Sequence, residues 1–324
     1  MTREKTKIYI LNSLMRQGSK RAVISALLAN TGIAIIKFIA GLVSGSSAML
    51  AESYHSVSDT LNQVLLLYGL KKSKKPPDVQ HPFGHGKEQF FWSFVVAILL
   101  FGIAGIFSIR EGYHKLLNPE PIKNLYLNYF AIFSAFVFES YAFRIAVRNI
   151  KKEMKREQYK NFWEGVKHTK DPVNLAVFVE DLLALTGLSI AGVAITLAYF
   201  TKKIIIDAIA SLIIGILLMI FASFLAYEIK NLLIGEAVSL SKRKKILKIV
   251  KSSEGIKEVL KLKTMHLGSN KVLVTLEIDY EDSLTVKEIK KLNLEIEQKI
   301  KNIIPDAEIY LEASSQNFKK KNKS

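Results

Sequence analysis

Residues 46–70 read SSAMLAESYHSVSDTLNQVLLLYGL, and this stretch decides the fold expected for the chain. It is long enough for a transmembrane helix, because about 20 residues cross a bilayer. It also carries Glu52, His55, Asp59 and Asn62, at intervals of three and four residues. Side chains so spaced share one helical face. Because an ionisable group inside a span costs about 2.5–3.5 kcal/mol on insertion scales, this face indicates a functional site.

Further apolar segments of similar length flank this stretch on both sides. Backbone groups in lipid must be satisfied within a segment, so each is expected to be a helix. The six expected spans are residues 22–43, 47–70, 90–109, 125–147, 173–200 and 204–233. Taken together, they predict a membrane all-α six-helix bundle over residues 22–235.

Lys and Arg are distributed unevenly among the loops. The segment before the first span and the loops after the second and fourth spans hold 20 of them, whereas the opposite loops hold 5. Because positive charge marks cytosolic loops, both termini are expected in the cytosol, including an N-terminal segment over residues 1–21. The chain is therefore expected to be a multi-pass integral membrane protein of the plasma or inner membrane. Its basic 148–170 loop is expected to contact anionic lipid rather than nucleic acid.

A different pattern begins after the last span. Residues 241–253 form a basic amphipathic pattern, 256–267 and 271–280 alternate like strands, 283–304 have helical spacing, and 307–314 form a last strand. Ser283 is a possible N-cap. The order αββαβ predicts a cytosolic α+β domain, ferredoxin- or metallochaperone-like, over residues 236–315. The polar tail at 316–324 is expected to be disordered.

The composition restricts the chemistry of any metal site. The chain has no cysteine and only six histidines, so ligands must come from His, Asp and Glu. His55 and Asp59 lie four residues apart and can converge on one ion. Polar residues also occur at the fifth span, at Asp171, Asn174, Glu180 and Asp181. One imidazole with two or three carboxylates suits zinc, but also Mn, Fe, Co or Cd. A polar contact between helices, or a proton relay without metal, is compatible with the same residues.

The 46–70 stretch, followed by HPFGHGKEQFFW at 81–92, resembles the cation diffusion facilitator family, in its zinc-transporter-like branch. The resemblance covers about residues 20–315. It implies a homodimeric antiporter that exchanges divalent metal ions for protons, with the transport site midway through the membrane. Carried over by residue, it implies His55 and Asp59 from the second span and Asp181 from the fifth as metal ligands.

The fourth ligand position departs from the family pattern. The family has His or Asp four residues before the second ligand of the fifth span, whereas this chain has Val177. Glu180, Glu52, Asn174 or a water molecule must then complete the coordination shell. Glu180 is the expected ligand, although it is adjacent to Asp181 and therefore about 100° away around the helix.

The resemblance also implies a second metal site in the cytosolic loop, held by Asp78 and His85. His81 is expected to shape the start of the third span instead. Lys87 matches a lysine that forms a charge interlock in the family, but the acidic partner position falls on Ile234 here. In the C-terminal domain, His266 is expected to be a surface residue, and no binuclear zinc site is expected.

These features predict a secondary transporter that exports a divalent metal ion, expected to be zinc, from the cytosol by proton antiport. No P-loop motif GxxxxGK[ST] and no metalloprotease motif HExxH occurs, so neither nucleotide-driven transport nor peptidase activity is expected. The prediction includes no enzyme activity and no cofactor. A manganese, iron or cobalt exporter of the same family, a metal-sensing regulatory membrane protein and an intramembrane metalloenzyme are the alternatives.

Overall fold

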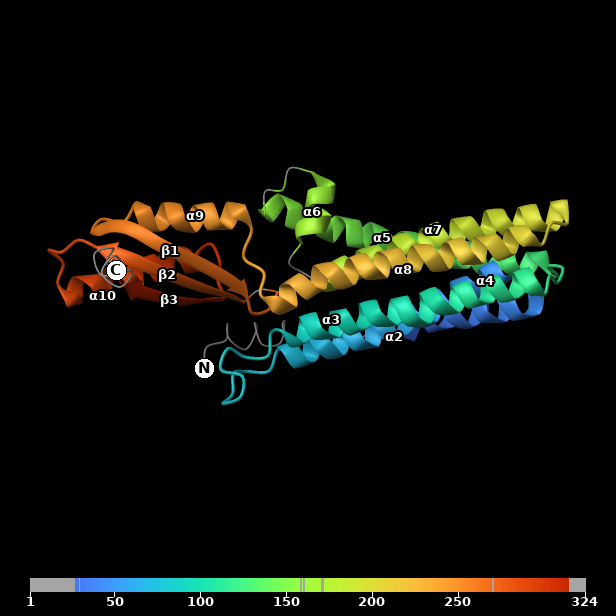
Figure 1. Cartoon of the computed structure of the whole chain (residues 1–324), viewed down its shortest axis with the longest axis horizontal. Coiled ribbons are helices and arrows are strands. Elements are labelled where there is room, and N and C mark those ends of the chain that lie inside the picture. Colours follow the sequence, from blue (N-terminus) through green and yellow to red (C-terminus); the bar gives the residue numbers. More distant parts are fainter. Residues whose placement is uncertain are drawn as a thin grey trace, which may run out of the picture. The chain divides into compact units, whose positions relative to one another are not determined.

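The computed structural model describes residues 27–28, 30–157, 159, 161–169, 172–269 and 271–314. The expected N-terminal segment at 1–21, the tail at 316–324 and Asp171 lie outside these residues. The described part contains long helices and a three-stranded sheet (Figure 1).

Helices occur at the positions of the expected spans, and several are longer than predicted. Among the described residues, four helices are long and apolar enough to cross a membrane, fewer than the six predicted: Glu88–Leu117, Leu125–Lys155, Val173–Thr201 and Ile205–Ile234. The helix of the 46–70 stretch, which carries Glu52, His55 and Asp59, is not among the four, and the described Asn30–Ser44 helix is shorter. The described helices that precede the C-terminal domain are Asn30–Ser44, α2 (Ser47–Ser73), α3 (Glu88–Leu99), a π-helical segment η1 (Leu100–Ile106), α4 (Phe107–Leu117), α5 (Leu125–Glu157), α6 (Phe162–His168), α7 (Pro172–Thr201) and α8 (Ile205–Ile234).

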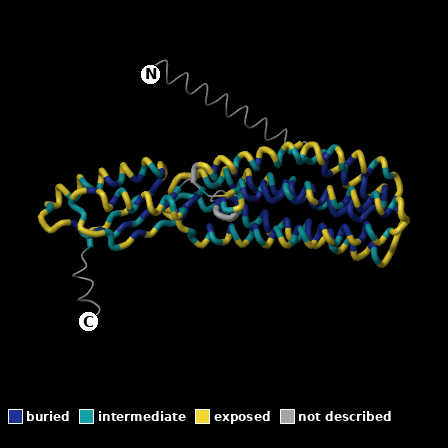
Figure 2. The backbone as a smooth tube through the Cα atoms, turned by 90° about the horizontal axis from the view of Figure 1, so that it is seen from above, coloured by how far each residue is buried: buried dark blue, intermediate teal, exposed yellow. Residues whose placement is uncertain are grey.

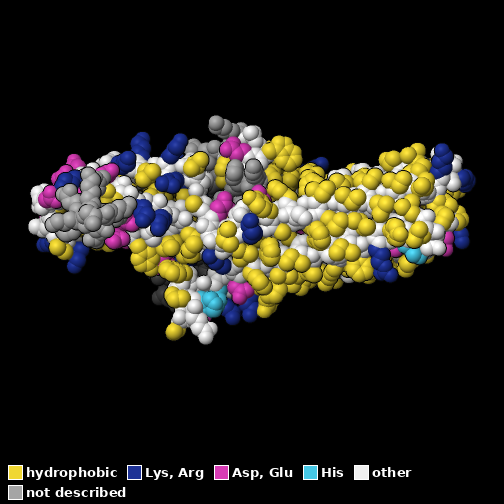
Figure 3. Space-filling model, in the orientation of Figure 1, with side chains coloured by type: hydrophobic (Ala, Val, Ile, Leu, Met, Phe, Trp, Pro, Cys, Tyr) yellow, Lys and Arg dark blue, Asp and Glu magenta, His cyan; other side chains and the backbone are white. Residues whose placement is uncertain are grey.

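Large apolar side chains cover the outside of these helices. Phe133 and Phe200 are each 72% exposed, and Figure 3 shows hydrophobic side chains gathered over the long helices. Buried residues lie along the inner sides of the helices in Figure 2, and many of them are alanines. An apolar outer surface of this extent suits lipid rather than water.

Glycines allow two neighbouring helical segments to approach closely. A Cβ atom at Gly105 would lie 2.5 Å from Cγ of Met219, and one at Gly112 would lie 2.8 Å from the carbonyl oxygen of Ala208. These positions join η1 and α4 to α8. Gly102, in contrast, faces open space. Small residues therefore set the packing distance at some of the glycines in the spans, as they do in other membrane bundles.

Asp207, in the first turn of α8, caps the start of α2. Its fully buried carboxylate accepts hydrogen bonds from Ser46 Oγ (2.6 Å), from Ser47 N and Oγ (2.7 and 2.9 Å) and from Ala48 N (3.3 Å). The first backbone N–H groups of a helix have no partner within the helix. Asp207 supplies that partner from another helix and so fixes the start of α2.

We expect Asp207→Ala to destabilise the protein strongly. The change removes the acceptor of four hydrogen bonds, and each bond to a charged group contributes about 1.5–3 kcal/mol. The loss should therefore be about 3 kcal/mol or more, which thermal unfolding of the purified protein in detergent will measure. Asp282→Ala is the matched control, because the Asp282 side chain is 90% exposed. Equal melting temperatures for the two variants would contradict this role of Asp207.

The C-terminal domain contains α9 (Leu240–Lys251), β1 (Ile256–His266), β2 (Val272–Tyr280), α10 (Val286–Lys301) and β3 (Ala307–Ala313). The strands lie in the order β1-β2-β3, with β1 antiparallel and β3 parallel to the central strand. The segment β2-α10-β3 is thus a crossover between parallel strands, the connection that a helix ordinarily makes.

The core of this domain lies where α9 and α10 pack on the sheet. Alternate residues of β2, such as Val274 and Ile278, are buried against Ile296 and Ile300 of α10. The N-cap of α10 differs from the prediction.

Thr285, not Ser283, caps α10. Its side chain accepts a hydrogen bond from the backbone of Glu288, whose carboxylate in turn accepts one from the Thr285 backbone N–H. This is a capping box, and the spacing Thr-x-x-Glu in the sequence already carried its signature.

The prediction that His266 is a surface residue was also wrong. The residue is only 3% exposed at the end of β1, and its backbone N–H donates to Glu236 O. His266 and Leu262 are the two buried residues of β1, and they lie four positions apart, on the same face of the strand.

Candidate metal sites

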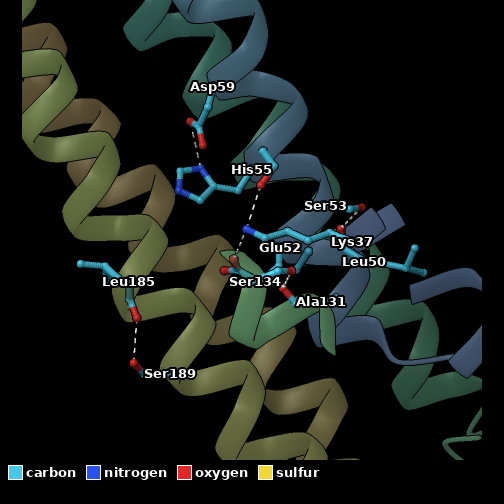
Figure 4. Close-up of polar contacts among 12 residues, drawn as sticks. Lys37, Leu50, Glu52, Ser53, His55, Asp59, Ala131, Ser134, Leu185 and Ser189 are labelled. Carbon is cyan, nitrogen blue, oxygen red and sulfur yellow. Dashed lines mark hydrogen bonds and ion pairs between the residues drawn. The ribbon is translucent and has the colours of Figure 1, made fainter. Parts of the chain in front are cut away.

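The polar face predicted for the 46–70 stretch exists in α2 and is buried. Glu52, His55 and Asn62 are fully buried, and Asp59 is nearly so. Nδ1 of His55 lies 3.4 Å from Oδ1 of Asp59, without the geometry of a hydrogen bond (Figure 4). The spacing of four residues therefore brings an imidazole and a carboxylate together inside the helices.

The second polar group comes from α7 and faces α2. Asn62 Nδ2 donates to Oε1 of Glu180 at 2.7 Å, and both Glu180 and Asp181 are buried. Adjacent residues on a helix point about 100° apart, yet neither carboxylate lies on the exposed side of α7. Asn174 and Val177 also lie in α7, each half-buried.

Several ligand-type atoms on these two helices have no hydrogen-bond partner within the described part of the chain. They are Oε1 of Glu52, Nδ1 and Nε2 of His55, Oδ1 of Asp59, Oδ1 of Asn62 and Oδ2 of Asp181. An unsatisfied buried polar atom costs about 1–3 kcal/mol, so a cluster of them needs an explanation such as a bound ion. Imidazole nitrogens and carboxylate oxygens are ligands that zinc and similar dications accept.

The four proposed ligands are not drawn together around one point. The structure brings His55 and Asp59 together, whereas Glu180 and Asp181 lie on the facing helix α7. Among the described residues, no three ligand atoms from this set lie within 4.8 Å of one another. Binding of one ion by all four residues would therefore require their side chains to move together.

Sequence reasoning missed one charged residue of this region. Lys37, in the Asn30–Ser44 helix, is fully buried, and its Nζ donates to Glu52 Oε2 (3.1 Å) and Ser56 Oγ (2.8 Å). The signal was present in the sequence, since a lysine in the middle of an apolar span is rarely buried unless it is paired.

The loop between α2 and α3 forms a compact group of ligand atoms. Asp78, His81 and His85 each offer one atom, and the three lie within 4.8 Å of one another. Asp78 Oδ2 is 2.9 Å from Nε2 of His85, and Asp78 Oδ1 is 3.2 Å from Nδ1 of His81. The structure thus places His81 beside the two residues expected at this site, rather than apart from them.

The Asp78 carboxylate is ionised at every ordinary pH. Its contact with His85, followed by the hydrogen bond from the His81 backbone N–H, lowers its pKa to about 2. A carboxyl group whose pKa is lowered by folding stabilises the folded loop above the unfolded pKa of about 3.9, and this contribution is lost as the pH falls towards 2. Asp78 therefore remains charged throughout the neutral range, as a metal ligand at this loop would have to be.

We expect Asp78→Asn to weaken metal binding in the loop by about 10–100-fold, because the amide removes the charge that attracts the ion and anchors both imidazoles. Equilibrium dialysis of Zn²⁺ against the full chain in detergent will measure the number of ions bound and their Kd in the variant and in the wild type. Asp282→Asn, another exposed acid outside the loop, is the control. Unchanged binding stoichiometry and affinity in Asp78→Asn would contradict a loop site.

Lys87 makes a backbone contact. Its Nζ donates to the carbonyl oxygen of Leu233 at 3.2 Å, next to Ile234, the position where the charge interlock would need an acid. The loop also contacts the C-terminal domain, where Lys271 Nζ donates to the Phe83 carbonyl oxygen at 3.0 Å.

Comparison with known proteins follows the same division of the chain. A family model described as the cation efflux transmembrane domain matches residues 23–234. A second model, described as the cytoplasmic domain of cation efflux proteins, matches residues 239–312. The two models meet at the change of pattern after α8.

Individual relatives cover most of this chain. Metal tolerance protein C4 of Arabidopsis thaliana is 32% identical over 278 residues, which are 85% of this chain and 60% of the relative. The human mitochondrial proton-coupled zinc antiporter SLC30A9 is 27% identical over 275 residues, 85% of this chain and 48% of the relative. The manganese efflux system protein MneP of Bacillus subtilis (strain 168) is 27% identical over 294 residues, covering 90% and 94%. This chain thus spans about half the length of some of the relatives that it matches.

Proposed function

Because the chain belongs to the cation efflux (cation diffusion facilitator) family of transporters, we propose that it exports zinc from the cytosol in exchange for protons. The family is one of integral membrane cation transporters, not of enzymes. The proposal adds the substrate, the counter-ion, six spans with both termini in the cytosol, and a homodimer joined through the C-terminal domain.

One observation carries the proposal. His55 and Asp59 on α2 and Asp181 on α7 present buried ligand atoms that have no hydrogen-bond partner in the part of the chain that the structure describes, and Glu180 of α7 contacts Asn62 of α2. A structural ion pair or helix–helix contact would supply hydrogen-bond partners for these atoms permanently. A transported dication would supply a partner for them only while it is bound. The four residues are our proposed transport ligands.

Zinc is proposed first because one imidazole and up to three carboxylates form a four-ligand set that zinc accepts. Two relatives carry names that specify different metals, a proton-coupled zinc antiporter and a manganese efflux protein. Nitrogen and oxygen ligands alone discriminate poorly among divalent metals. A manganese, iron or cobalt exporter is therefore the alternative substrate assignment.

The same ligands explain coupling to protons. Imidazole and carboxylate groups bind metal only in their deprotonated forms, so metal binding and proton binding compete at His55, Asp59, Glu180 and Asp181. When the site opens to the cytosol, these groups bind the metal ion. When it opens to the opposite side, protons replace the ion, and the inward flow of protons drives export.

Flux into proteoliposomes tests this function. The full chain is reconstituted with an indicator for divalent metal inside the vesicles, and a pH gradient is imposed in either direction. Zinc flux that reverses with the gradient supports the antiporter. Flux with Mn²⁺, Fe²⁺ or Co²⁺ but not with Zn²⁺ would keep the transporter and change its substrate. The absence of flux for all four metals would favour a metal-sensing membrane protein, for which the replacement of a usual ligand by Val177 is the supporting feature.

A further inference from the structure

A lysine lies fully buried among the membrane-type helices. Lys37 is paired with two side chains of α2. Its Nζ lies 3.1 Å from Glu52 Oε2 (Figure 4) and 2.8 Å from Ser56 Oγ. Burying an ammonium group without a partner is costly, so both contacts are needed to keep the lysine in place. The Lys37–Glu52 ion pair is therefore a fixed part of the interior.

Glu52 lies next to the proposed transport ligands. It precedes His55 by three residues and therefore shares its face of α2. Lys37 holds Oε2 of Glu52, while Oε1 is buried and has no hydrogen-bond partner within the described chain. This free oxygen lies against α7, where a Cβ at Gly187 would come within 2.0 Å of it. Glu52 is thus a carboxylate between α2 and α7 that is half engaged by a protein cation.

The charge of Lys37 lies among buried carboxylates. Its ammonium contacts Glu52 at 3.1 Å, and Asp59, Glu180 and Asp181 are buried on α2 and α7 as well. The region holds an excess of carboxylates, and Lys37 offsets part of their charge. A metal ion arriving at His55 and Asp59 therefore meets, on the same face of α2, a carboxylate that is already paired with a protein cation through one of its oxygens.

We propose that Lys37 is a positioning residue that sets metal selectivity by holding Glu52 out of the coordination shell. This inference rests on the proposed function. With Glu52 engaged, the ion meets one imidazole and three carboxylates, which suits four-coordinate Zn²⁺. With Glu52 released, the site gains a further oxygen ligand, which favours Mn²⁺ with its higher coordination number and its preference for oxygen.

Metal binding to a set of Lys37 and Glu52 variants tests the proposal. The full chain in detergent carries Asp78→Asn in every case, so that the membrane site dominates. Equilibrium dialysis then gives the Kd for Zn²⁺ and for Mn²⁺, and the readout is the ratio of the two, which a loss of stability alone would not change. The variants are Lys37→Met, Lys37→Arg, Glu52→Gln and the double variant Lys37→Met with Glu52→Gln.

Lys37→Met should shift the ratio towards Mn²⁺ by on the order of tenfold, because it frees Glu52. Lys37→Arg should keep the ratio, because the cation remains. The double variant should return the ratio to that of the parent, since neither the cation nor the extra carboxylate is left. Removing both members of a buried ion pair is tolerated far better than removing one, so the double variant folds even where Lys37→Met does not.

Three results would overturn the proposal. One is a ratio unchanged in Lys37→Met. The second applies where Lys37→Met cannot be purified. It is a shift of the Zn²⁺-to-Mn²⁺ affinity ratio towards Mn²⁺ in Glu52→Gln or in the double variant. The third is the absence of metal binding in the parent chain, which would overturn the proposed function as well. In the first two cases, zinc flux that still depends on Asp181 leaves the transporter intact.

Discussion

Asp181→Asn should abolish proton-driven zinc flux, lowering it by about 100-fold or more in proteoliposomes. The amide is nearly the same size as the carboxylate, so the packing of α7 is retained. It loses the negative charge, and the buried Oδ2, which has no hydrogen-bond partner among the described residues, is replaced or reoriented. Altering groups that only support metal ligands already costs 10–100-fold in affinity or activity, and removing a ligand costs more.

The control for Asp181→Asn is Glu120→Gln, which neutralises an exposed acid in the loop between α4 and α5. Both variants should elute as folded protein and melt at similar temperatures. If Asp181→Asn were folded and carried zinc at the rate of Glu120→Gln, Asp181 would not be a ligand. The transport site would then have to be sought among the other buried polar residues.

The second large effect concerns the fourth ligand. Glu180→Gln should reduce zinc flux by about 10–100-fold, because it removes a carboxylate that faces α2 and is held there by Asn62. In this background, Val177→Asp should restore part of the flux. Positions 177 and 181 are one helical turn apart, so the new carboxylate would lie on the same face of α7 as Asp181.

This rescue distinguishes a ligand from a structural role. Asn62→Asp is not a suitable control, because it would add a charge beside Glu180. Val177→Asn is suitable, since it has the size of Asp without its charge and should give no rescue in Glu180→Gln. Wild-type flux in Glu180→Gln alone would show that Glu180 serves only to bind Asn62, and that another group or water completes the shell.

The sequence predicted most of the architecture because its signals are strong and local. A span needs a long apolar run, and a strand with one buried face needs alternation, so the bounds of α7, α8 and β2 fell within a few residues of their predicted positions. The polar face of α2 was predicted for the same reason, from spacing within one helix. The caps were harder, and Thr285 was overlooked in favour of Ser283, although the capping-box pattern was present.

Contacts between separate helices could not be predicted in this way. The pairing of Lys37 with Glu52 joins residues 15 positions apart on two helices, and the contact of Asp207 with Ser47 joins residues 160 positions apart. Periodicity says which face of a helix is polar, but not which other helix faces it. Whether Glu180 turns towards α2 likewise depends on Asn62, a partner 118 positions away.

The carboxylate of Asp207 has a mechanical consequence. It fastens the first turn of α8 to the first turn of α2, and the glycine contacts fasten η1 and α4 to the same helix α8. Sliding any of these segments past another would break buried hydrogen bonds or force backbones into collision. Any rearrangement that exposes His55 and Asp59 first to one side of the membrane and then to the other must therefore move α2, η1, α4 and α8 together as a rigid unit. The relative movement must occur between this unit and the other helices.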